Sequence, residues 1–377
     1  MGFDFTVAII PDTTSIDREL NYLKSSVLYA DKVTLISPLA YLIEKLIYAR
    51  PKNEKECLNL LYQVLPLAKQ SDYEFYNSAV QTIRELESII RSRKYKAVPV
   101  RQKLELKKNL TTFAEEVSRS ITDLIGAKQV NELESMIQSG QVIINEFQTS
   151  FDDLDGLVFE YFDMLRVSLR NTYPLFDEQS SNLMKAAVTS RVIHLSDIDR
   201  KKITHAGLTD NCLQKLPSFS EATANELIDI KKELSIPLIR FRSKMICYSE
   251  TIQSMPWDDD FETECQILYS KEIAPSLLEI EEMTNDETFK KNLGKKFFTD
   301  TGTWKSAGSL VVGIAAGGVI SAFNDVISTQ AATLASVGGA YVIPKIAESY
   351  IEYRENLKDI EKKDLYFYYK AGKILEK

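Results

Sequence analysis

The sequence contains few of the side chains that carry out chemistry at neutral pH. Its 377 residues include only two histidines, His194 and His205. Their spacing to the nearest cysteine does not match the short gaps between paired ligands in structural zinc sites. The four cysteines lie far apart, so we expect reduced thiols, with no disulfide framework, no metal and no cofactor. These cysteines are Cys57, Cys212, Cys247 and Cys265.

Other common signatures are also missing. Residues 302–309 lack the Gly-Lys-Ser/Thr ending of a phosphate-binding loop, and no kinase or hydrolase signature is present. No basic stretch followed by an apolar core and a cleavage site is found near residue 1, so we expect no signal peptide. The formal net charge of −8 argues against general binding to nucleic acid. An enzyme of a familiar class is therefore not predicted.

The first fifty residues predict a strand, a helix and a second strand. Residues 3–10 are rich in β-branched and aromatic side chains, which is typical of a strand. Apolar residues at positions 16, 20, 23 and 27 then predict a helix, and residues 33–36 form a second short apolar run. A crossover of this length allows the strands to be parallel neighbours. We therefore predict a mainly α protein with a small amino-terminal parallel βαβ portion.

Polar residues follow both predicted strands. Ligands of open parallel sheets bind beyond the carboxyl ends of the strands, so these residues are candidates for ligand binding. Asp12 also has a carboxylate that could hold a metal ion, whereas the alternative is that all of them cap the following helices. The candidates are Asp12, Thr13, Thr14 and Ser37.

From about residue 53 to residue 291 apolar residues mostly recur at helical spacing. The pattern predicts helices at 154–172 and 221–254, the second kinked or broken by Pro237. Residues 142–144, after Gly140, favour a short strand as an alternative to helix. Residues 201–217 are predicted to form a loop. The closing aromatic run, residues 365–370, is expected to dock on the core or to lie at a bilayer surface.

One segment is strongly basic although the chain is acidic. Between residues 91 and 108 there are eight basic residues and one acidic residue. Such a segment can contact phosphates of anionic lipid or nucleic acid, or can be a solvated linker. Pro99 favours a linker and a domain boundary there. The candidate contacts are Arg91, Arg93, Lys94, Lys96 and Arg101.

Residues 306–343 carry a single charged side chain, Asp325, and are rich in glycine, alanine and serine. They predict two helices joined by a polar turn. Small residues four apart lie on one helix face and let backbones approach closely, as in lipid. Each half has about 18 residues, near the lower limit for crossing a bilayer. Lysines flank both ends. A buried hairpin within a helical protein is the alternative. The small residues are Ser309, Gly313, Gly317, Ser321, Ala332, Ser336 and Ala340.

Three sequence pieces carry a resemblance to a group of uncharacterised bacterial proteins. They are Leu28–Val33 followed by Ser37-Pro38, then Pro237–Arg242, and finally Tyr366–Leu375. The group has an LLYADKV-type α/β start and a PLxRFR-type helix. The resemblance implies a bacterial, intracellular protein, and it implies no activity and no functional residues.

Together these observations predict an α/β portion at 1–98, a helical domain at 99–292, and a glycine/alanine-rich hairpin with a charged and aromatic end at 293–377. The function we expect is that of a non-enzymatic effector or sensor that acts at the membrane, of the kind used in stress or phage defence. We expect it in the cytoplasm, at the inner face of the cell membrane, with lipid and a second copy as candidate partners. A soluble interaction protein that binds a ligand or partner through its α/β end is the alternative, and a metal-dependent enzyme using Asp12 is the third.

Overall fold

A computed structural model describes residues 2–10, 16–48, 53–65, 73–92, 95, 97–149, 154–284 and 360–376. The predicted βαβ unit is confirmed. Strand β1 (Asp4–Ala8) pairs in parallel with β2 (Lys32–Ile36), and α1 (Asp17–Tyr29) connects them. The chain is mainly helical, with one four-stranded sheet. The predicted glycine/alanine-rich hairpin lies outside the described residues.

The sheet is completed by two strands from much later in the sequence. Its order is β3-β2-β1-β4, and every pair is parallel. The short strand expected after Gly140 is β3 (Val142–Ile144). Strand β4 (Tyr173–Phe176) was not predicted, and it follows α8 (Leu154–Asn171), which was. The predicted boundary at residues 98–99 falls between two helices, and the sheet draws strands from both sides of it.

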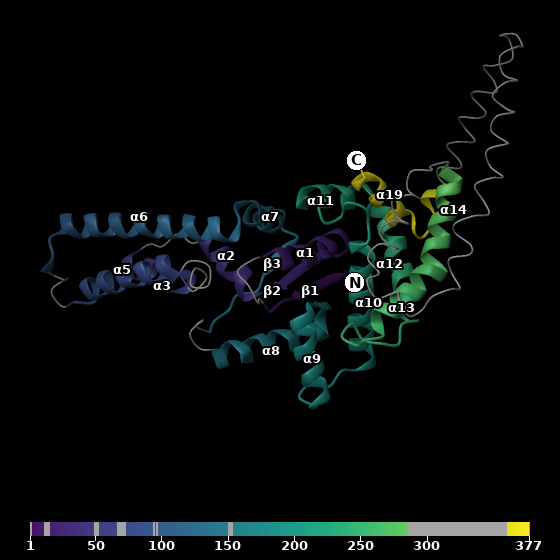
Figure 1. The fold of residues 1–377 in the computed structure, drawn as a ribbon, viewed down its shortest axis with the longest axis horizontal. Helices are drawn as coiled ribbons and strands as arrows, with labels where there is room; N and C mark the ends of the chain where they lie inside the picture. Colours follow the sequence, from purple (N-terminus) through teal and green to yellow (C-terminus); the bar gives the residue numbers. More distant parts are fainter. Residues whose placement is uncertain are drawn as a thin grey trace, which may run out of the picture.

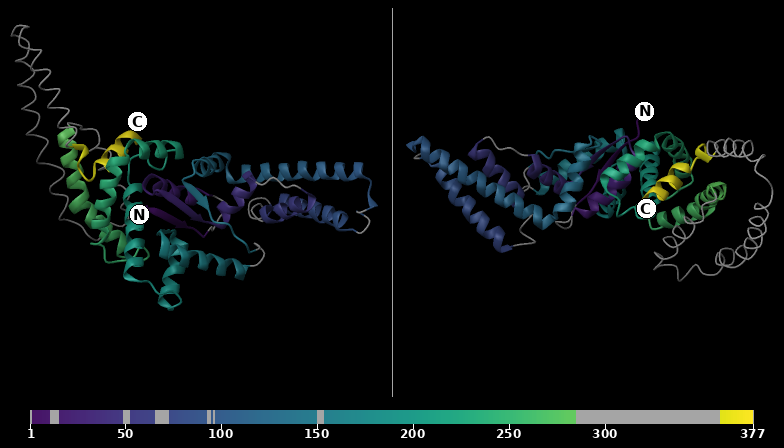
Figure 2. Two further views of the ribbon diagram at one scale, coloured as in Figure 1. Left: turned by 180° about the vertical axis from the view of Figure 1, so that it is seen from behind. Right: turned by 90° about the horizontal axis from the view of Figure 1, so that it is seen from above.

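Between β2 and β3 the chain forms an arm that projects from the sheet (Figures 1 and 2). Helix α2 (Pro38–Tyr48) leads into the arm, and Gly126, at φ 107°, joins α6 to the helix that returns to the sheet. Leu110, Val117 and Ile121 of α6 are buried inward. The arm consists of α3 (Glu54–Val64), α5 (Tyr73–Arg91) and α6 (Val100–Ile125), and the returning helix is α7 (Ala127–Gln138).

The sheet is covered unequally on its two faces. Helices α1, α7 and α11 (Ala224–Glu233) pack together on one face, where Val142 and Ile144 are buried (Figure 1). Helix α8 lies on the other face, toward β4, and Ile143 on this side is 54% exposed. Side chains of a strand alternate between faces, so the exposure of Ile143 shows that α8 leaves part of the sheet uncovered.

A helical layer packs beside β4, at the opposite end of the molecule from the arm (Figure 1). The prediction of a loop at 201–217 was wrong, since residues up to Gln214 belong to a helix. This helix is buried at ten positions and has no amphipathic stripe, so its sequence does not show a helical pattern. Its Gly207 allows Pro256 to approach so closely that a Cβ atom would lie 2.6 Å from the proline Cγ. The layer contains α10 (Asp197–Gln214), α12 (Ser235–Ser249), α13 (Phe261–Leu268), a π-helical turn (Tyr269–Ile273), α14 (Ala274–Thr284) and α19 (Tyr366–Leu375); α9 (Glu178–Thr189) precedes it.

The single helix expected at 221–254 is two helices, α11 and α12. Helix α11 begins with a capping box, in which Thr223 and Glu226 exchange hydrogen bonds. The break falls at Leu234, and Pro237 lies in the first turn of α12, where a missing N–H costs little. The expected docking of the aromatic end is confirmed, since Phe367 and Tyr368 of α19 are fully buried.

Candidate functional site

The carboxyl ends of the parallel strands place three polar side chains in one region. Ser37 directly follows β2 and Asp177 directly follows β4, on either side of the central strand β1. Glu19, in the first turn of α1, joins them, because the Ser37 hydroxyl donates to Glu19 Oε1 over 2.9 Å. We call Glu19, Ser37 and Asp177 the carboxyl-edge cluster. It lies where open parallel sheets bind ligands.

Ser37 serves the structure in two ways. Besides its bond to Glu19, its hydroxyl accepts the backbone N–H of Ala40 over 3.2 Å and so caps the first turn of α2. The side chain is fully buried. Ser37 was predicted either to bind a ligand or to cap a helix, and in the structure it caps a helix. The other three, Asp12, Thr13 and Thr14, lie outside the described residues.

Glu19 is the most perturbed acid of the cluster. It is 1% exposed, and burial raises the pKa of its carboxyl to about 7, helped by the charge of Asp177. Hydrogen bonds, including that from Ser37, oppose the rise only in part. Close to neutral pH this side chain therefore exchanges between a protonated and an ionised form inside the protein.

Asp177 is held by a denser set of donors. Its carboxylate accepts the backbone N–H of Ser180 over 2.9 Å, which caps α9, and Arg18 Nη1 over 3.1 Å. The Ser180 hydroxyl also lies 2.8 Å from the hydroxyl of Tyr161 on α8. These contacts join α1, α8 and α9 around the end of β4, which accounts for a fully buried carboxylate.

The chemistry available to the cluster is limited by its burial. A carboxyl with a pKa near neutrality suits proton transfer, but a general acid or base must reach a substrate. Glu19, Ser37 and Asp177 expose almost no surface and are bonded to one another or to helix ends. Among the residues that the structure describes, no group of three or more His, Cys, Asp or Glu side chains is placed to hold a metal ion.

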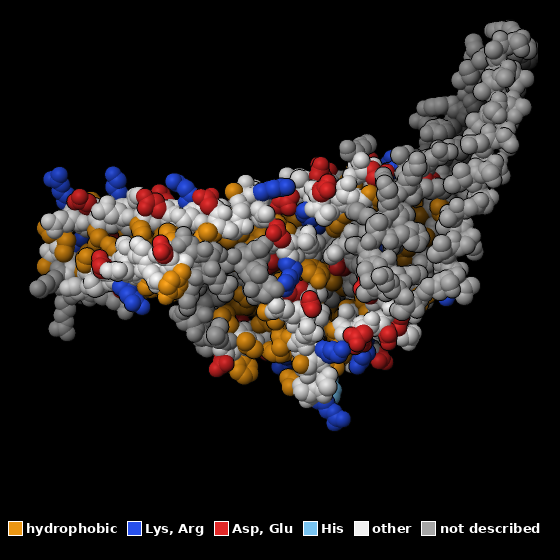
Figure 3. Space-filling view, viewed as in Figure 1, with side chains coloured by type: hydrophobic (Ala, Val, Ile, Leu, Met, Phe, Trp, Pro, Cys, Tyr) orange, Lys and Arg blue, Asp and Glu red, His pale blue; other side chains and the backbone are white. Residues whose placement is uncertain are grey.

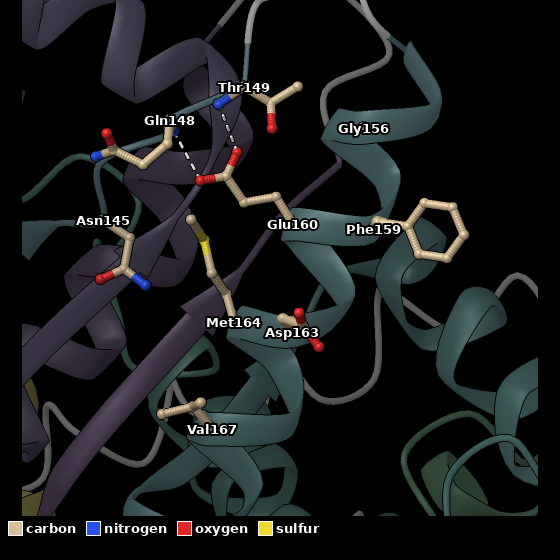
Figure 4. Close-up of a pocket in the computed structure, with 9 residues that line it drawn as sticks. All are labelled: Asn145, Gln148, Thr149, Gly156, Phe159, Glu160, Asp163, Met164 and Val167. Carbon is tan, nitrogen blue, oxygen red and sulfur yellow. Dashed lines mark hydrogen bonds between the residues drawn. The ribbon is translucent and has the colours of Figure 1, made fainter.

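A more open feature lies beside the cluster, between the chain that follows β3 and helix α8 (Figure 4). It is a shallow groove of about 550 Å³. Glu160 points to its upper wall and accepts the backbone N–H groups of Gln148 and Thr149 over 2.7 and 2.9 Å. These bonds hold the pKa of Glu160 below its ordinary value, so the carboxylate stays ionised and orders the loop.

The outer face of α8 beside this groove is apolar. Phe159 and Val167, which both line the groove, are 75% and 59% exposed, whereas Val158, which is 52% exposed, does not line it. Figure 3 shows hydrophobic side chains gathered over α8. Exposed apolar groups that gather in a patch mark interaction sites more often than isolated ones do. With the partly uncovered sheet face next to it, this surface is an accessible apolar region on the described part of the chain.

The basic segment lies at the end of the arm. Arg101 is exposed in the first turn of α6, and Arg91 is the last residue of α5. The structure does not describe the side chain of Arg91. The remaining predicted contacts, Arg93, Lys94 and Lys96, lie outside the described residues, as do all seven small residues predicted to line the hairpin.

The contacts of the buried Arg242 of α12 were not predicted from the sequence. Its Nη1 lies 2.9 Å from Asp31 Oδ1, and its Nε donates to the Tyr29 carbonyl oxygen over 2.9 Å. The guanidinium also lies over the rings of Phe3 and Tyr29. The sequence does contain an indication that Arg242 is buried. Arg242 stands four residues after Leu238 and three before Met245, so it lies on the buried side of the helix.

This cluster brings together the three sequence pieces that carry the resemblance. Arg242 of the second piece binds Tyr29 and Asp31 of the first, and the adjacent Phe241 stacks on Phe367 of the third with ring centroids 5.3 Å apart. The side chains of the three pieces therefore form contacts between α1, α12 and α19. These packing contacts account for the residue types found in the three pieces.

Comparison of the chain with protein-family models, with curated proteins and with solved structures found no match. Across the described ranges, no helix has the combination of length and apolar content that crossing a bilayer requires.

Proposed function

We propose that the protein is a non-enzymatic effector or sensor that acts at a membrane through residues 306–343. The observation that carries the proposal is the position of the two chain ends that flank this region. The described residues before this region end at Thr284, the end of α14, and those after it begin at Ile360, shortly before α19. Helices α14 and α19 pack against each other (Figure 1).

Specific contacts fix the returning end beside the departing one. Lys363 Nζ lies 2.7 Å from Glu279 Oε1 of α14, and Arg240 Nη1 of α12 donates to the carbonyl oxygen of Glu361 over 2.6 Å. Ile360 and Leu365 are buried. Both ends of residues 285–359 are therefore attached to one helical layer of the body.

This attachment supports an even number of bilayer crossings. A segment whose two ends are held side by side has both ends on the same side of a membrane, as a helical hairpin requires. Residues 306–343 contain one charged side chain, Asp325, and lysines flank the region on both sides. Positive flanks favour the cytoplasmic side for both ends. The small residues at fourfold spacing favour close helix packing in lipid.

Fractionation of cells that express the full chain tests the proposal. We expect the protein in the membrane fraction after an alkaline carbonate wash. The double variant Val312→Asp/Ile314→Asp should move it to the wash supernatant, because each carboxylate costs about 2.5–3.5 kcal/mol in the centre of a membrane helix. The matched control Val192→Asp/Ile198→Asp changes two exposed apolar residues of the body and should stay with the membrane. Recovery of the unaltered chain wholly in the soluble fraction would contradict the proposal.

The apolar surface of α8 favours a second candidate function, a protein interaction beside the parallel sheet. The groove and the exposed Phe159 and Val167 offer a surface for a second copy of the chain. Sedimentation of the chain in mild detergent over a range of concentrations tests this. Self-association that Phe159→Ser/Val167→Ser abolishes, and Val192→Ser/Ile198→Ser does not, would support it. A monomer at every concentration would count against it.

A further inference from the structure

The far end of the arm differs from the rest of the surface in charge and in apolar exposure. Helix α5 ends at Arg91 and α6 begins at Val100, and both of these helix ends lie at the far end of the arm (Figure 1). The sequence of this turn and of the start of α6, residues 91–108, is strongly basic. This end lies opposite to α14 and α19, the helices that precede and follow residues 285–359 in the sequence.

Aliphatic side chains stand next to the basic ones. Val100 is 73% exposed and Leu104, one turn later on the same face of α6, is 62% exposed. Ile89 near the end of α5 is 49% exposed. Arg101 and Lys108 are exposed on the same stretch of α6, and Figure 3 shows Lys and Arg side chains standing out along this helix. We call Ile89, Val100, Arg101, Leu104 and Lys108 the arm tip.

Acidic groups also lie close to the arm tip, and several of them are engaged. Glu54 Oε1 accepts the hydroxyl of Tyr95 over 3.2 Å, Glu56 accepts the side-chain amide of Asn53 over 2.7 Å, and Glu87 accepts the hydroxyl of Tyr62 over 2.7 Å. Glu85 on α5 and Glu105 on α6 are exposed. From residue 85 to residue 108 the sequence has eight basic and three acidic residues, so this stretch is positive although the whole chain carries a net charge of −8.

We propose that the arm tip binds the surface of an anionic lipid bilayer. A helix that presents aliphatic side chains among lysines and arginines suits the boundary between headgroups and acyl chains, where both kinds of side chain are stabilised. Each Lys or Arg near such a surface contributes about 1 kcal/mol. This binding is peripheral, and it does not depend on insertion of residues 306–343.

A bilayer fits the arm tip better than a nucleic acid does. Proteins that hold single-stranded nucleic acid combine positive charge with aromatic faces on which bases stack. The aromatic ring described at the turn, Tyr95, has Lys103 Nζ 5.3 Å from its centroid and bonds to Glu54. The exposed apolar groups of the arm tip are aliphatic, and aliphatic groups suit acyl chains.

Flotation of the full chain with vesicles tests the inference. Binding of the full chain to neutral phosphatidylcholine vesicles measures any insertion of residues 306–343. The additional binding to vesicles that contain phosphatidylserine measures the contribution of the arm tip. Removing two charges in Arg101→Gln/Lys108→Gln should weaken this additional binding roughly 25-fold at low salt, and salt should weaken it for the unaltered chain. The matched control Lys201→Gln/Lys232→Gln removes two exposed charges of the body and should leave it unchanged.

The outcomes separate this inference from the proposed function. Equal binding to neutral and anionic vesicles, or equal weakening by both variant pairs, would overturn the role of the arm tip even if the chain inserts. Additional binding to anionic vesicles that the arm variant loses would support that role even if no insertion into neutral vesicles occurs. Val100→Ser/Leu104→Ser should reduce the additional binding too. If the arm variant instead loses binding to a single-stranded RNA oligonucleotide and keeps its binding to lipid, the inference is wrong.

Discussion

Glu19→Gln should stabilise the protein at alkaline pH and leave its stability nearly unchanged at acidic pH. Glutamine has the shape of a protonated glutamate, and its side-chain oxygen can accept the same hydroxyl of Ser37 that Glu19 accepts over 2.9 Å. The buried site favours an uncharged side chain, since burial is the largest cause of the raised pKa of Glu19. The variant therefore removes the cost of ionisation and keeps the packing.

The size of the effect follows from the pKa of Glu19, which the fold raises from 4.5 to about 7. Below the lower value the carboxyl is protonated in both states. Between the two values the unfolded chain loses a proton that the folded chain keeps, so stability falls as the pH rises. Above the upper value the folded chain carries the full cost, about 3.5 kcal/mol at roughly 1.4 kcal/mol per pKa unit.

Thermal unfolding followed by circular dichroism at pH 5 and pH 8 measures this difference. At pH 8 the variant should melt roughly 5 °C above the unaltered chain, and at pH 5 by much less. Glu105→Gln, at an exposed position of α6, is the matched control and should change neither melting temperature. Burial also raises the pKa of Asp210 to about 6. Because Asp210 titrates in both the variant and the unaltered chain, its effect on the difference between their melting temperatures cancels. An equal shift at both pH values, or a loss of stability at pH 8, would refute the reasoning.

Three further substitutions test the contacts around the sheet. Asp177→Asn keeps the helix cap but removes a charge that raises the pKa of Glu19, so the fall in stability with rising pH should end at a more acidic pH and be smaller; an unchanged profile would contradict this coupling. Arg242→Met should cost about 1–3 kcal/mol in urea unfolding, because it leaves the buried carbonyl oxygen of Tyr29 without the donor that Arg242 supplies; a cost as small as that expected for the exposed Arg166→Met would argue against the cluster. Gly207→Ala should destabilise by about 1–3 kcal/mol, since its Cβ would lie 2.6 Å from the ring of Pro256; a neutral effect would show that the turn that carries Pro256 moves away from α10 easily.

The strands and helices with clear periodicity could be predicted from the sequence. Strands β1 and β2 are apolar runs that end at proline or at serine followed by proline, and α1 between them has a regular apolar stripe. Strand β4 was missed because Tyr173-Pro174 after a long helix looks like a helix end and a loop. Helix α10 was missed because it is buried on most sides by β4, α1 and α12, so its polar and apolar residues do not alternate with helical period.

The buried charges were harder to predict. Glu19 and Arg242 stand at positions that belong to the buried stripes of α1 and α12, but a charged side chain is ordinarily expected at the surface. Their partners, Ser37 for one and Asp31 for the other, come from strand ends that only the folded sheet brings close. Local periodicity indicates which side of a helix is buried, whereas the pairing of these groups depends on tertiary contacts.

The membrane proposal is tested most directly by the side of the bilayer on which position 325 lies. In cells that express Asp325→Cys, a maleimide that cannot cross membranes is added to spheroplasts before and after lysis. The proposal predicts that the cysteine at the hairpin turn reacts before lysis, and that Cys247, which is exposed on α12 of the body, reacts only after lysis. Reaction of both cysteines only after lysis would contradict it.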